Sequence, residues 1–548
     1  MEPTKRKITL FFQQEKKGAS ALKAGTGPAL CAPTRAACRT FKRLPSIWTF
    51  DDVTMDKLEA NNPFFHQVTL SGFQRVRGLI LGCVLFPIRL ALVVLFFLLM
   101  WPFARLCLAG LSAEERARPV SGWRRLFFHP PVYLLSRAVF LSLGFLWVRV
   151  KGRKADLKEA PMLVVAPHST FMDMLVLCPT HLPTVVSRSE NTGLPVIGAL
   201  LEFNQSVLVS RNDPDSRKKA VAQLTERLNS NGYWPQMLMF PEGTTTNGSA
   251  LIKFKPGAFL CGVPVQPVLL RYPNKVDTVR WSHKGTTWVE ALWHTTSQIY
   301  TNMTVEFLPV YNPSAEEKNN PELYADNVQK LMAEALGIPA TDYVMQGGVP
   351  VQKVGGLSLP LSSPGREALT LLRKAGMGTR QVESALDRIL DRCQSGSSEA
   401  GAGDLAALLG LADERTAVSV CGLYSQGKMA DLRQIYLNVA ALSGLVDIRS
   451  ILRTAFNLFD KEGTGSLSAE ELSDLMGALL GIRQYHTEQL YAEIACNGRL
   501  NQDDFVHGLT SHTTYQKVVC EHLQPNPATR HLLVNNNGSL PHGNKKAI

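Results

Sequence analysis

The sequence predicts an α/β domain at residues 151–345, between N-terminal membrane helices at 71–150 and an all-α C-terminal domain at 406–515. Short apolar runs typical of strands recur through the middle region, with helical patterns such as 216–228 between them. This alternation favours a mixed or mostly parallel sheet covered by helices. The chain of 548 residues is long enough for two or three domains of ordinary size.

The first 70 residues form a basic segment that is predicted to be disordered. Residues 1–50 contain ten Lys and Arg against Glu2 and Glu15, a local balance of +8 out of a formal net charge of +12. A segment rich in charge, Gly, Ala and Pro cannot bury a core, and its cations are suited to contact with anionic lipid. The basic cluster at 5–7 is too short to indicate a nucleic-acid partner, so none is expected.

Two apolar stretches predict membrane-embedded helices in the N-terminal part. Residues 78–104 are all apolar or small except Arg89, which closely follows Pro87. Uninterrupted, this stretch is long enough to cross a hydrocarbon core of about 30 Å. The proline and the arginine keep a re-entrant hairpin or an interfacial helix pair open as the alternative. The second stretch, 132–148, is shorter, and a core helix packed on the next domain is an equal alternative for it.

A strand-like run at 162–166 ends at a proline and is followed by His168 and, five positions on, Asp173. Five residues correspond to about 500° of helix, so the two side chains meet only if the chain turns at the histidine. Ser169 or Thr170 then caps the helix that carries the aspartate. A neutral imidazole can take a proton from a hydroxyl near pH 7, and a carboxylate can hold its other nitrogen in one tautomer. Such a pair also arises by chance in a chain with 12 histidines and 46 acidic residues, so its meaning depends on a second element.

The second element is the run 237–240, which ends at a proline followed by a carboxylate, a glycine and several hydroxyls. The glycine permits a tight turn that exposes backbone N–H groups, and the threonines add donors for a phosphate or an oxyanion. The segment lacks Gly-Lys-Ser/Thr and is therefore no Walker loop. A polar turn that caps the next segment is the alternative. The candidate binding residues are Glu242, Gly243, Thr244, Thr245, Thr246 and Asn247.

Four segments in order resemble the four blocks of the glycerolipid acyltransferase family. HSTFMD at 168–173 resembles the first block, and FPEGTTTN at 240–247 resembles the third. The run 206–211, which ends in Arg211, resembles the second, and the Val-Pro-rich run 263–268 resembles the fourth. One departure is Thr245, where the family usually carries Cys or another small residue.

Further stretches resemble one group within this family. The segment 254–259, FKPGAF, is similar to that of the lysophosphatidylcholine acyltransferases. The stretches 194–201 and 372–376 are similar to the lysophosphatidylethanolamine type. The resemblance is close over 120–345 and looser toward the C-terminus.

The resemblance implies transfer of a fatty acyl group from acyl-CoA, as co-substrate, to the free hydroxyl of a lysophospholipid, with no cofactor or metal required. Lysophosphatidylethanolamine or lysophosphatidylcholine is the implied acceptor, in phospholipid remodelling. His168 would be the general base, Asp173 would orient it, and Arg211 would pair with a phosphate. The open alternative is a catalytically idle membrane adaptor or calcium-responsive lipid-binding protein that retains the same fold.

Beyond residue 346 the sequence predicts a helical connector and a small-residue linker up to 405, then a degenerate EF-hand-like domain. The best loop, 460–471, has Asp at position one, Gly at six, an apolar residue at eight and Glu at twelve. Glu at position three and Thr at position five weaken it, so a metal-free remnant is favoured over calcium binding. The candidate calcium ligands are Asp460, Glu462, Thr464, Ser466, Ser468 and Glu471.

Two features bear on the compartment. The ten cysteines are scattered without a Cys-x-x-Cys pair, which indicates neither zinc nor a disulfide framework and fits a reducing, cytosolic face. The flexible tail expected at 516–548 ends Lys-Lys-Ala-Ile, which resembles the dilysine retrieval signal of endoplasmic-reticulum membrane proteins. The sequence therefore predicts an endoplasmic-reticulum membrane protein whose catalytic domain and C-terminus face the cytosol.

Overall fold

In the computed structural model the described residues form two compact units, which meet in the sequence between Met345 and Gln346. The structure describes residues 62–524, with gaps at 211–212, 283, 426–428, 486 and 496–497. Most of the expected basic segment at 1–70 and the dilysine end of the chain lie outside the described residues.

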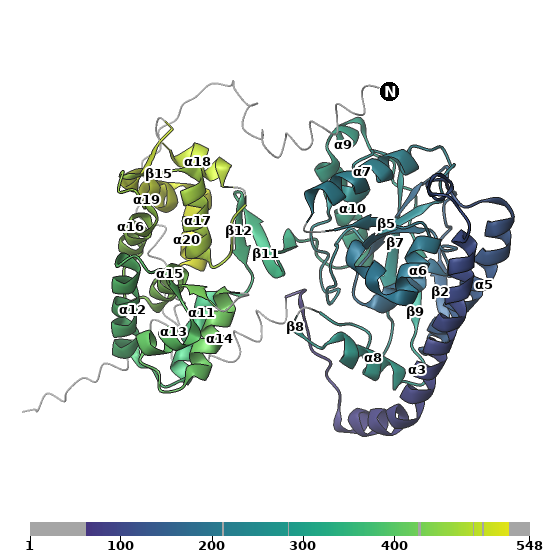
Figure 1. The fold of residues 1–548 in the computed structure, drawn as a ribbon, viewed down its shortest axis with the longest axis horizontal. Coiled ribbons are helices and arrows are strands. Elements are labelled where there is room, and N and C mark those ends of the chain that lie inside the picture. Colours follow the sequence, from purple (N-terminus) through teal and green to yellow (C-terminus); the bar gives the residue numbers. More distant parts are fainter. Residues whose placement is uncertain are drawn as a thin grey trace, which may run out of the picture. The chain divides into compact units, whose positions relative to one another are not determined.

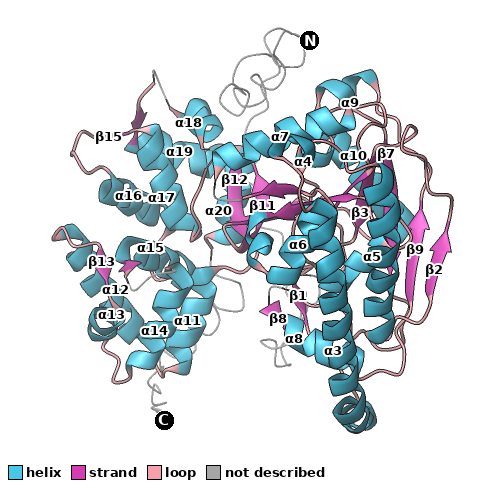
Figure 2. Ribbon diagram, turned by 45° about the vertical axis from the view of Figure 1, so that its right-hand side comes forward, coloured by secondary structure: helices cyan, strands magenta, loops and turns pink. Residues whose placement is uncertain are grey.

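The N-terminal part of the first unit is a pair of long helices, α3 (Gly72–Leu108) and α5 (Gly122–Ser142), with the short helix α4 (Ala113–Arg116) between them. α3 continues through Pro87 and Pro102, and among the described residues it is the one helix long and apolar enough to cross a membrane. Figures 1 and 2 show α3 and α5 side by side along one flank of the unit.

The middle of α3 is fixed to the rest of the first unit. The Arg89 guanidinium donates hydrogen bonds to the backbone carbonyls of Thr296 at 2.8 Å, Gln298 at 2.6 Å and Ile299 at 2.7 Å. About two helical turns earlier, Gly82 lies so close to the same region that a Cβ would come within 2.5 Å of Ser297 Oγ. The arginine that interrupts the apolar stretch therefore satisfies three carbonyls of the sheet domain.

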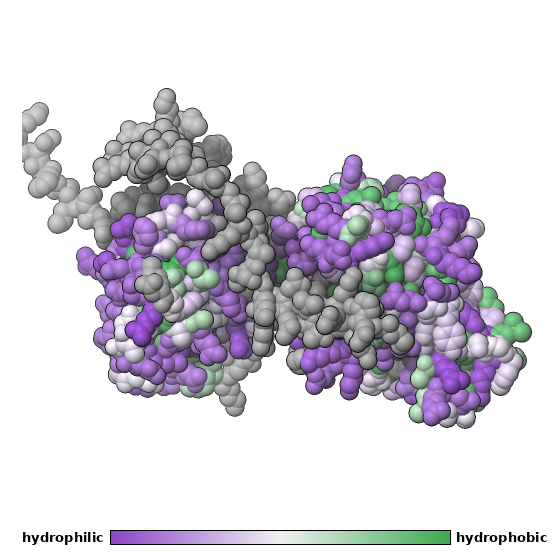
Figure 3. Space-filling view, turned by 90° about the horizontal axis from the view of Figure 1, so that it is seen from above, coloured by the Kyte–Doolittle hydropathy of each residue, from purple (hydrophilic) through white to green (hydrophobic). Residues whose placement is uncertain are grey.

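The opposite side of α3 is apolar and exposed. Leu79 and Ile80 are 59% and 64% exposed, and Phe73, Val84 and Leu98 are also exposed. Figure 3 shows apolar side chains, drawn green, along the edge of the unit where α3 and α5 lie. A contiguous apolar surface of this kind is unusual on a soluble monomer and indicates a lipid or protein contact.

Seven strands form one sheet in the order β2-β9-β7-β3-β6-β4-β5, and every neighbouring pair is parallel except β7 with β9. This confirms the expected mixed, mostly parallel sheet of an α/β domain. The strands are β2 (Val148–Lys151), β3 (Met162–Ala166), β4 (Thr184–Arg188), β5 (Val207–Val209), β6 (Met237–Met239), β7 (Val265–Arg271) and β9 (Met303–Phe307). The helices of the unit are η1 (Phe171–Leu177), η2 (Ser189–Gly193), α6 (Pro195–Phe203), α7 (Pro214–Leu228), η3 (Pro256–Ala258), α8 (Trp288–Thr296), α9 (Ala315–Asn319) and α10 (Pro321–Leu336).

The strand β3 lies in the middle of this sheet and is buried on both faces. Leu163 and Val165 pack into a core with α3, α5 and α6, whereas Met162 and Val164 pack into a second core with α7 and α10. Successive side chains of a strand point to opposite faces, so a strand between two helical layers is apolar at every position. This double burial holds the C-terminal end of β3 rigidly.

The second unit is helical apart from a hairpin and two pairs of two-residue strands. β13 (Glu399–Ala400) pairs with β14 (Ala430–Asp431), and β15 (Ser466–Leu467) pairs with β16 (Leu500–Asn501), both antiparallel. The hairpin is β11 (Val349–Val354) and β12 (Leu357–Pro360), and the helices are α11 (Pro364–Lys374), α12 (Thr379–Gln394), α13 (Ala402–Leu409), α14 (Glu414–Tyr424), α15 (Leu432–Ser443), α16 (Ile448–Phe459), α17 (Ala469–Leu480), α18 (Glu488–Ile494), α19 (Gln502–Ser511) and α20 (Thr513–His522).

The structure moves three of the expected domain boundaries. One apolar core runs through the second unit from Leu357 to Leu523, so residues 346–405 are part of this domain rather than a connector and linker. The small-residue stretch was expected to lack structure, but β13 lies in it and pairs with β14. Residues 516–522 belong to α20 and not to a flexible tail. In the first unit the sheet begins at Val148, because β2 pairs with β9.

Candidate active site

Three functional side chains follow the C-terminal ends of three adjacent strands. β3 lies between β7 and β6 and is parallel to both. His168 comes two residues after β3, Glu242 three residues after β6, and Tyr272 directly after β7. Because the carboxyl ends of parallel strands meet at one edge of a sheet, these residues lie together where α/β proteins bind their ligands.

His168 and Asp173 form a hydrogen-bonded pair, with 2.9 Å between Nδ1 and Oδ2. Thr170 caps η1 and Asp173 is the third residue of that helix, so its carboxylate turns back to accept from the N–H groups of Ser169 at 2.7 Å and Thr170 at 3.0 Å. The expected turn and cap are confirmed, although the helix is 3-10 and not α. The imidazole is 21% exposed and the carboxylate 0%, so a substrate can reach the ring while its partner stays shielded.

Tyr272 completes the shell of donors around Asp173. Its phenol donates a hydrogen bond to Oδ1 at 2.5 Å. Burial is the main cause that raises the pKa of Tyr272 well above its usual value, and the charge of Asp173 raises it further, so the phenol keeps its proton and remains a donor. The sequence analysis did not identify Tyr272 as a site residue. Its position directly after the apolar run at 265–270, at the same sheet edge as His168, is the signal that could have indicated it.

The turn after β6 packs against the histidine loop. The Thr246 N–H donates to the His168 carbonyl at 2.8 Å, and the Phe240 ring stacks on the imidazole with 4.3 Å between ring centroids. Gly243 has a φ of +64°, a conformation that favours glycine, and a Cβ there would lie 2.9 Å from Lys255 Nζ. The two sequence elements therefore meet at one place, and a cation from the FKPGAF segment lies beside the glycine turn.

Glu242 is buried inside this turn, at 1% exposure. Its Oε2 accepts a hydrogen bond from Thr246 Oγ1 at 3.3 Å, whereas Oε1 is buried without a partner among the described residues. Burial raises the pKa of Glu242 well above its usual value, opposed by a backbone hydrogen bond from His168 and by the Thr246 hydroxyl. The carboxyl group therefore holds its proton more tightly than an exposed glutamate does.

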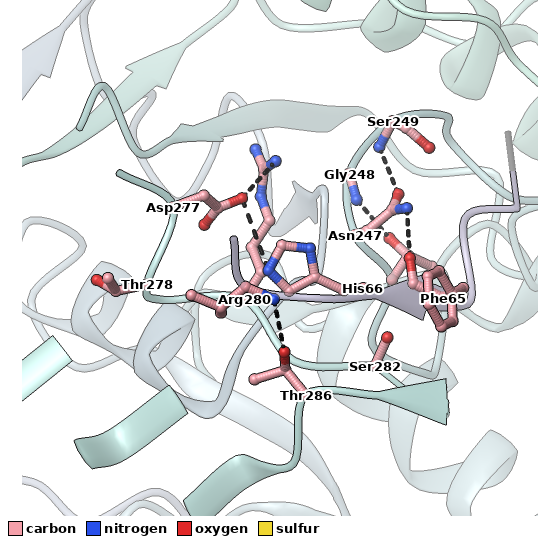
Figure 4. Close-up of polar contacts among 12 residues, drawn as sticks. Phe65, His66, Asn247, Gly248, Ser249, Asp277, Thr278, Arg280, Ser282 and Thr286 are labelled. Atoms are coloured by element: carbon pink, nitrogen blue, oxygen red, sulfur yellow. Dashed lines mark hydrogen bonds and ion pairs between the residues drawn. The ribbon is translucent and has the colours of Figure 1, made fainter. Parts of the chain in front are cut away.

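Asn247, one of the predicted binding residues, has its amide occupied by the segment that precedes α3. Its Nδ2 donates to the carbonyls of Asn62 at 3.1 Å and Phe65 at 2.8 Å, and its backbone N–H donates to Pro63 at 2.7 Å. Its Oδ1 accepts from the Ser249 N–H at 2.8 Å, and Figure 4 shows this amide between the two segments. The side chain therefore ties the chain near residue 64 to the active-site turn.

The other predicted binding residues differ in their placement. Thr244 and Thr245 are half-buried at the surface of the turn, whereas Thr246 is fully buried against Glu242. Arg211, the predicted phosphate partner, lies outside the described residues. Thr244 and Thr245 are therefore, like Gly243 and Asn247, partly accessible residues of the turn.

In the second unit, the loop between α16 and α17 uses its carboxylates internally. The two Asp460 oxygens accept from the N–H groups of Thr464 at 3.0 Å and Gly465 at 2.8 Å. Glu471 caps α17 and accepts from the N–H and the hydroxyl of Ser468, both at 2.9 Å. Within the described ranges, no group of three or more His, Cys, Asp or Glu residues converges on a metal position.

The comparisons with known proteins agree with the site in the first unit. A family model described as "Acyltransferase" matches residues 147–271, which contain the His168 pair and the Glu242 turn. The lysophospholipid acyltransferase LPCAT4 of Xenopus tropicalis is 44% identical over 85% of this chain and 90% of its own. LPCAT4 of Homo sapiens is 43% identical over 92% and 97%, and lysophosphatidylcholine acyltransferase 2 of Homo sapiens is 40% identical over 84% and 85%.

The matched family model and these relatives define an acyl-transferring enzyme. The chain belongs to the lysophospholipid acyltransferase family, because these relatives share more than a third of its residues over most of their length. A solved bacterial acyltransferase, PlsC from Thermotoga maritima, aligns over 48% of this chain and 98% of its own, at 20% identity and a TM-score of 0.33.

Proposed function

We propose that this enzyme transfers a fatty acyl group from acyl-CoA to the free hydroxyl of a lysophospholipid, with His168 as the general base. The observation that carries the proposal is the pair formed by His168 Nδ1 and the buried Asp173 carboxylate. Family membership supports the reaction class. Lysophosphatidylethanolamine and lysophosphatidylcholine are the acceptors that we infer.

The hydrogen bonds around Asp173 determine which nitrogen of His168 acts. A carboxylate only accepts hydrogen bonds, so Nδ1 is the donor in the pair and carries the proton. In the neutral ring the lone pair then lies on Nε2, which is the atom left to take a proton from the acceptor hydroxyl. The stack on Phe240 holds the plane of the ring, so Nε2 keeps one direction.

The reaction follows from this arrangement. As Nε2 removes the proton of the lysophospholipid hydroxyl, the oxygen attacks the thioester carbonyl carbon and the carbonyl electrons move to its oxygen. When the resulting tetrahedral oxyanion collapses, the carbon–sulfur bond breaks and the thiolate of CoA takes the proton from the imidazolium. Asp173 stabilises the imidazolium in between, and no proton is gained or lost overall.

The glycine turn supplies polar groups near the reacting atoms. The left-handed Gly243 and the half-buried Thr244 and Thr245 belong to the turn that packs against the histidine loop, and they are suited to hold the oxyanion or the polar part of the acceptor. Lys255 brings a positive charge to the same turn. Arg211 remains our candidate for a phosphate partner because of its place in the second sequence block.

The exposed side of α3 supports a membrane-bound location. A helix that is tied to the sheet domain at Gly82 and Arg89 has one face on protein, which favours an interfacial helix pair of α3 and α5 over a free transmembrane span. We infer that the active site works close to a lipid surface, where its substrates reside. We infer the endoplasmic reticulum and a cytosolic orientation from the dilysine end of the sequence.

The test is an acyl-transfer assay on the full chain in detergent micelles. Acyl-CoA is offered with lysophospholipids that carry ethanolamine, choline, serine or no head group, and the free thiol of CoA and the diacyl product are measured together. We expect equal amounts of thiol and product, with the ethanolamine and choline acceptors preferred. Release of thiol without diacyl product, or no turnover with any acceptor, would overturn the proposal.

A further inference from the structure

A second polar cluster lies beside the active-site turn, and it contains an arginine that has no role in the proposed proton transfer. Asp277 lies between Arg280 and His66, with 3.0 Å from its Oδ2 to Arg280 Nη1 and 4.0 Å to His66 Nε2. Figure 4 shows the carboxylate between the two side chains. Burial is the main cause that lowers the pKa of His66, so the arginine is the cation of this cluster at neutral pH.

Arg280 reaches the edge of the catalytic loop. A Cβ added at Gly248 would lie 3.5 Å from Arg280 Nη2 and 3.3 Å from Ser169 Oγ, so the guanidinium and this hydroxyl face the same point. The next residue, Trp281, donates its backbone N–H to the Ser169 carbonyl at 3.3 Å. Ser169 is the neighbour of His168 and donates its own N–H to Asp173. The arginine is therefore held one residue away from the catalytic pair.

Several polar groups at this place have no partner in the part of the chain that the structure describes. Ser169 Oγ and Arg280 Nε are both buried and unpaired, and Ser169 is only 1% exposed. The acceptor Asp277 Oδ1 on the other side of the guanidinium is also buried and unpaired. Unpaired buried polar groups are costly, and in native proteins they mark positions that a ligand or a bound water completes. The hydroxyl and the guanidinium face the same point near Gly248, and together they favour a ligand that accepts hydrogen bonds there.

Both substrates of the proposed reaction carry such a group. A lysophospholipid has a phosphodiester and acyl-CoA has several phosphates, yet the turn from Gly243 to Gly248 contains only glycine, threonine and asparagine. A guanidinium matches the geometry of phosphate oxygens, and it is paired here with Asp277 through Nη1 alone, which leaves Nε and Nη2 for a second acceptor.

We propose that Arg280 and Ser169 form a phosphate subsite at the edge of the active site, and that Asp277 and His66 are positioning residues that hold the guanidinium there. This inference rests on the proposed function, because the phosphate belongs to one of the two substrates. The subsite fixes a substrate relative to His168 Nε2, so its contribution lies in binding and in orientation rather than in proton transfer.

Steady-state kinetics of Arg280→Gln test this subsite and identify the substrate. The KM for the lysophospholipid is measured at saturating acyl-CoA, and the KM for acyl-CoA at saturating lysophospholipid. Loss of a charge-assisted hydrogen bond should raise one of the two KM values by about tenfold or more. A rise in the acceptor KM assigns the lysophospholipid phosphate, and a rise in the acyl-CoA KM assigns a CoA phosphate. Unchanged KM values for both substrates, with or without a lower kcat, would overturn the inference.

Two further variants and one control keep the test independent of folding. Ser169→Ala removes only the hydroxyl and should raise the same KM as Arg280→Gln, and Arg280→Lys should recover part of the loss. Lys253→Gln removes a cation of the same domain that is paired with Asp326, and should leave both KM values unchanged. If Arg280→Gln does not fold, a KM shift in Ser169→Ala supports the subsite and its absence overturns it.

A binding measurement separates this inference from the proposed function. The full chain in detergent is titrated calorimetrically with CoA and, separately, with glycerophosphoethanolamine, neither of which requires turnover. Arg280→Gln should weaken binding of the assigned ligand by about tenfold relative to the wild type. If the wild type transfers no acyl group yet Arg280→Gln weakens this binding, the proposed function fails and the subsite stands. Equal binding by wild type and variant of both probes overturns the subsite.

Discussion

The phenol of Tyr272 donates a 2.5 Å hydrogen bond to Asp173, the carboxylate that also accepts from His168 Nδ1. The two donors bind different oxygens of one fully buried side chain. Tyr272 follows β7 and His168 follows β3, so this bond joins two neighbouring strands across the site. Asp173 is therefore held from both sides, and the direction of the imidazole depends on a residue 99 positions further along the chain.

Replacing Tyr272 with Phe should lower kcat while the protein remains folded. A hydrogen bond to a charged group contributes about 1.5–3 kcal/mol, so we expect kcat to fall by about tenfold or more. A carboxylate with one donor fewer holds the imidazolium proton more tightly, so the acid limb of the pH–rate profile should move to higher pH. Turnover of the acyl-transfer reaction between about pH 5 and pH 9 measures both effects.

Tyr311→Phe is the matched control for this variant. Tyr311 donates a hydrogen bond to the Glu317 carboxylate at 2.6 Å, and its pKa is raised to about 12, mainly by burial. The Tyr311→Phe variant therefore loses the same kind of phenol–carboxylate bond, but away from the candidate active site. We expect a comparable loss of stability and an unshifted pH profile. An equal shift in both variants would mean that Tyr272 does not act through Asp173.

Glu242→Gln should change the pH dependence of stability. The pKa of Glu242 is raised in the folded protein, chiefly by burial, so the folded state binds this proton more tightly than the unfolded state. The contribution of Glu242 is then fully present below its unfolded pKa near 4.5 and is lost as pH rises toward the folded value. Melting temperatures at about pH 5 and pH 8 should therefore fall less steeply in the variant than in the wild type. An identical slope would contradict the raised pKa.

Arg89→Leu should loosen α3 from the sheet domain although it makes the helix more apolar. The three carbonyls of residues 296, 298 and 299 lose a charged donor, and a hydrogen bond to a charged group contributes about 1.5–3 kcal/mol, less for the exposed carbonyl of Ile299. Arg105→Leu is the control on the same helix, since its exposed pair with Glu202 is worth only about 0–1 kcal/mol. Melting temperatures in one detergent compare the two. If Arg89→Leu is as stable as Arg105→Leu, the three hydrogen bonds of Arg89 contribute nothing to the stability of the fold.

Calcium chelation should leave acyl transfer unchanged, because the loop at 460–471 uses its carboxylates for its own backbone. Asp460→Ala removes the acceptor of two N–H groups and should cost about 1 kcal/mol of stability, whereas the exposed Glu462→Ala should change it by less than about 0.5 kcal/mol. Calorimetric titration of the full chain with calcium checks the ligand itself. If the wild type binds calcium and both Asp460→Ala and Glu462→Ala abolish this binding, the loop is a calcium site and the prediction is wrong.

The sequence was most informative where a residue's role depends on its own neighbours. Buried parallel strands are continuous apolar runs, so the run at 162–166 could be placed as a strand and His168 at its end. The edge strand β2 is mostly exposed and alternates Val with Arg and Lys, so it lacks the continuous apolar run by which the buried strands are recognised. In the second unit the glycine- and serine-rich stretch before α13 reads as a linker, because nothing local reveals that β13 pairs with β14.

The parts of the site that the sequence did not reveal depend on distant contacts. Asn247 belongs to a recognisable block, yet its amide binds carbonyls more than 180 positions earlier in the chain. Arg280 has no motif around it, and its place beside Ser169 follows only from the packing of the loop after β7. Residue type and spacing predicted that His168 and Asp173 form a pair, whereas the groups that hold this pair could be found only in the folded structure.

Replacing His168 with Ala decides whether its imidazole is the base of this reaction. Acyl-CoA and lysophosphatidylethanolamine are supplied to the purified variant, and diacyl product is measured against wild type and against His507→Ala, an exposed histidine of the second unit. We predict that His168→Ala lowers kcat by about 10²- to 10⁴-fold, while detergent-micelle association and melting temperature stay close to those of the wild type. Product formation by His168→Ala at the rate of His507→Ala would show that another group removes the proton.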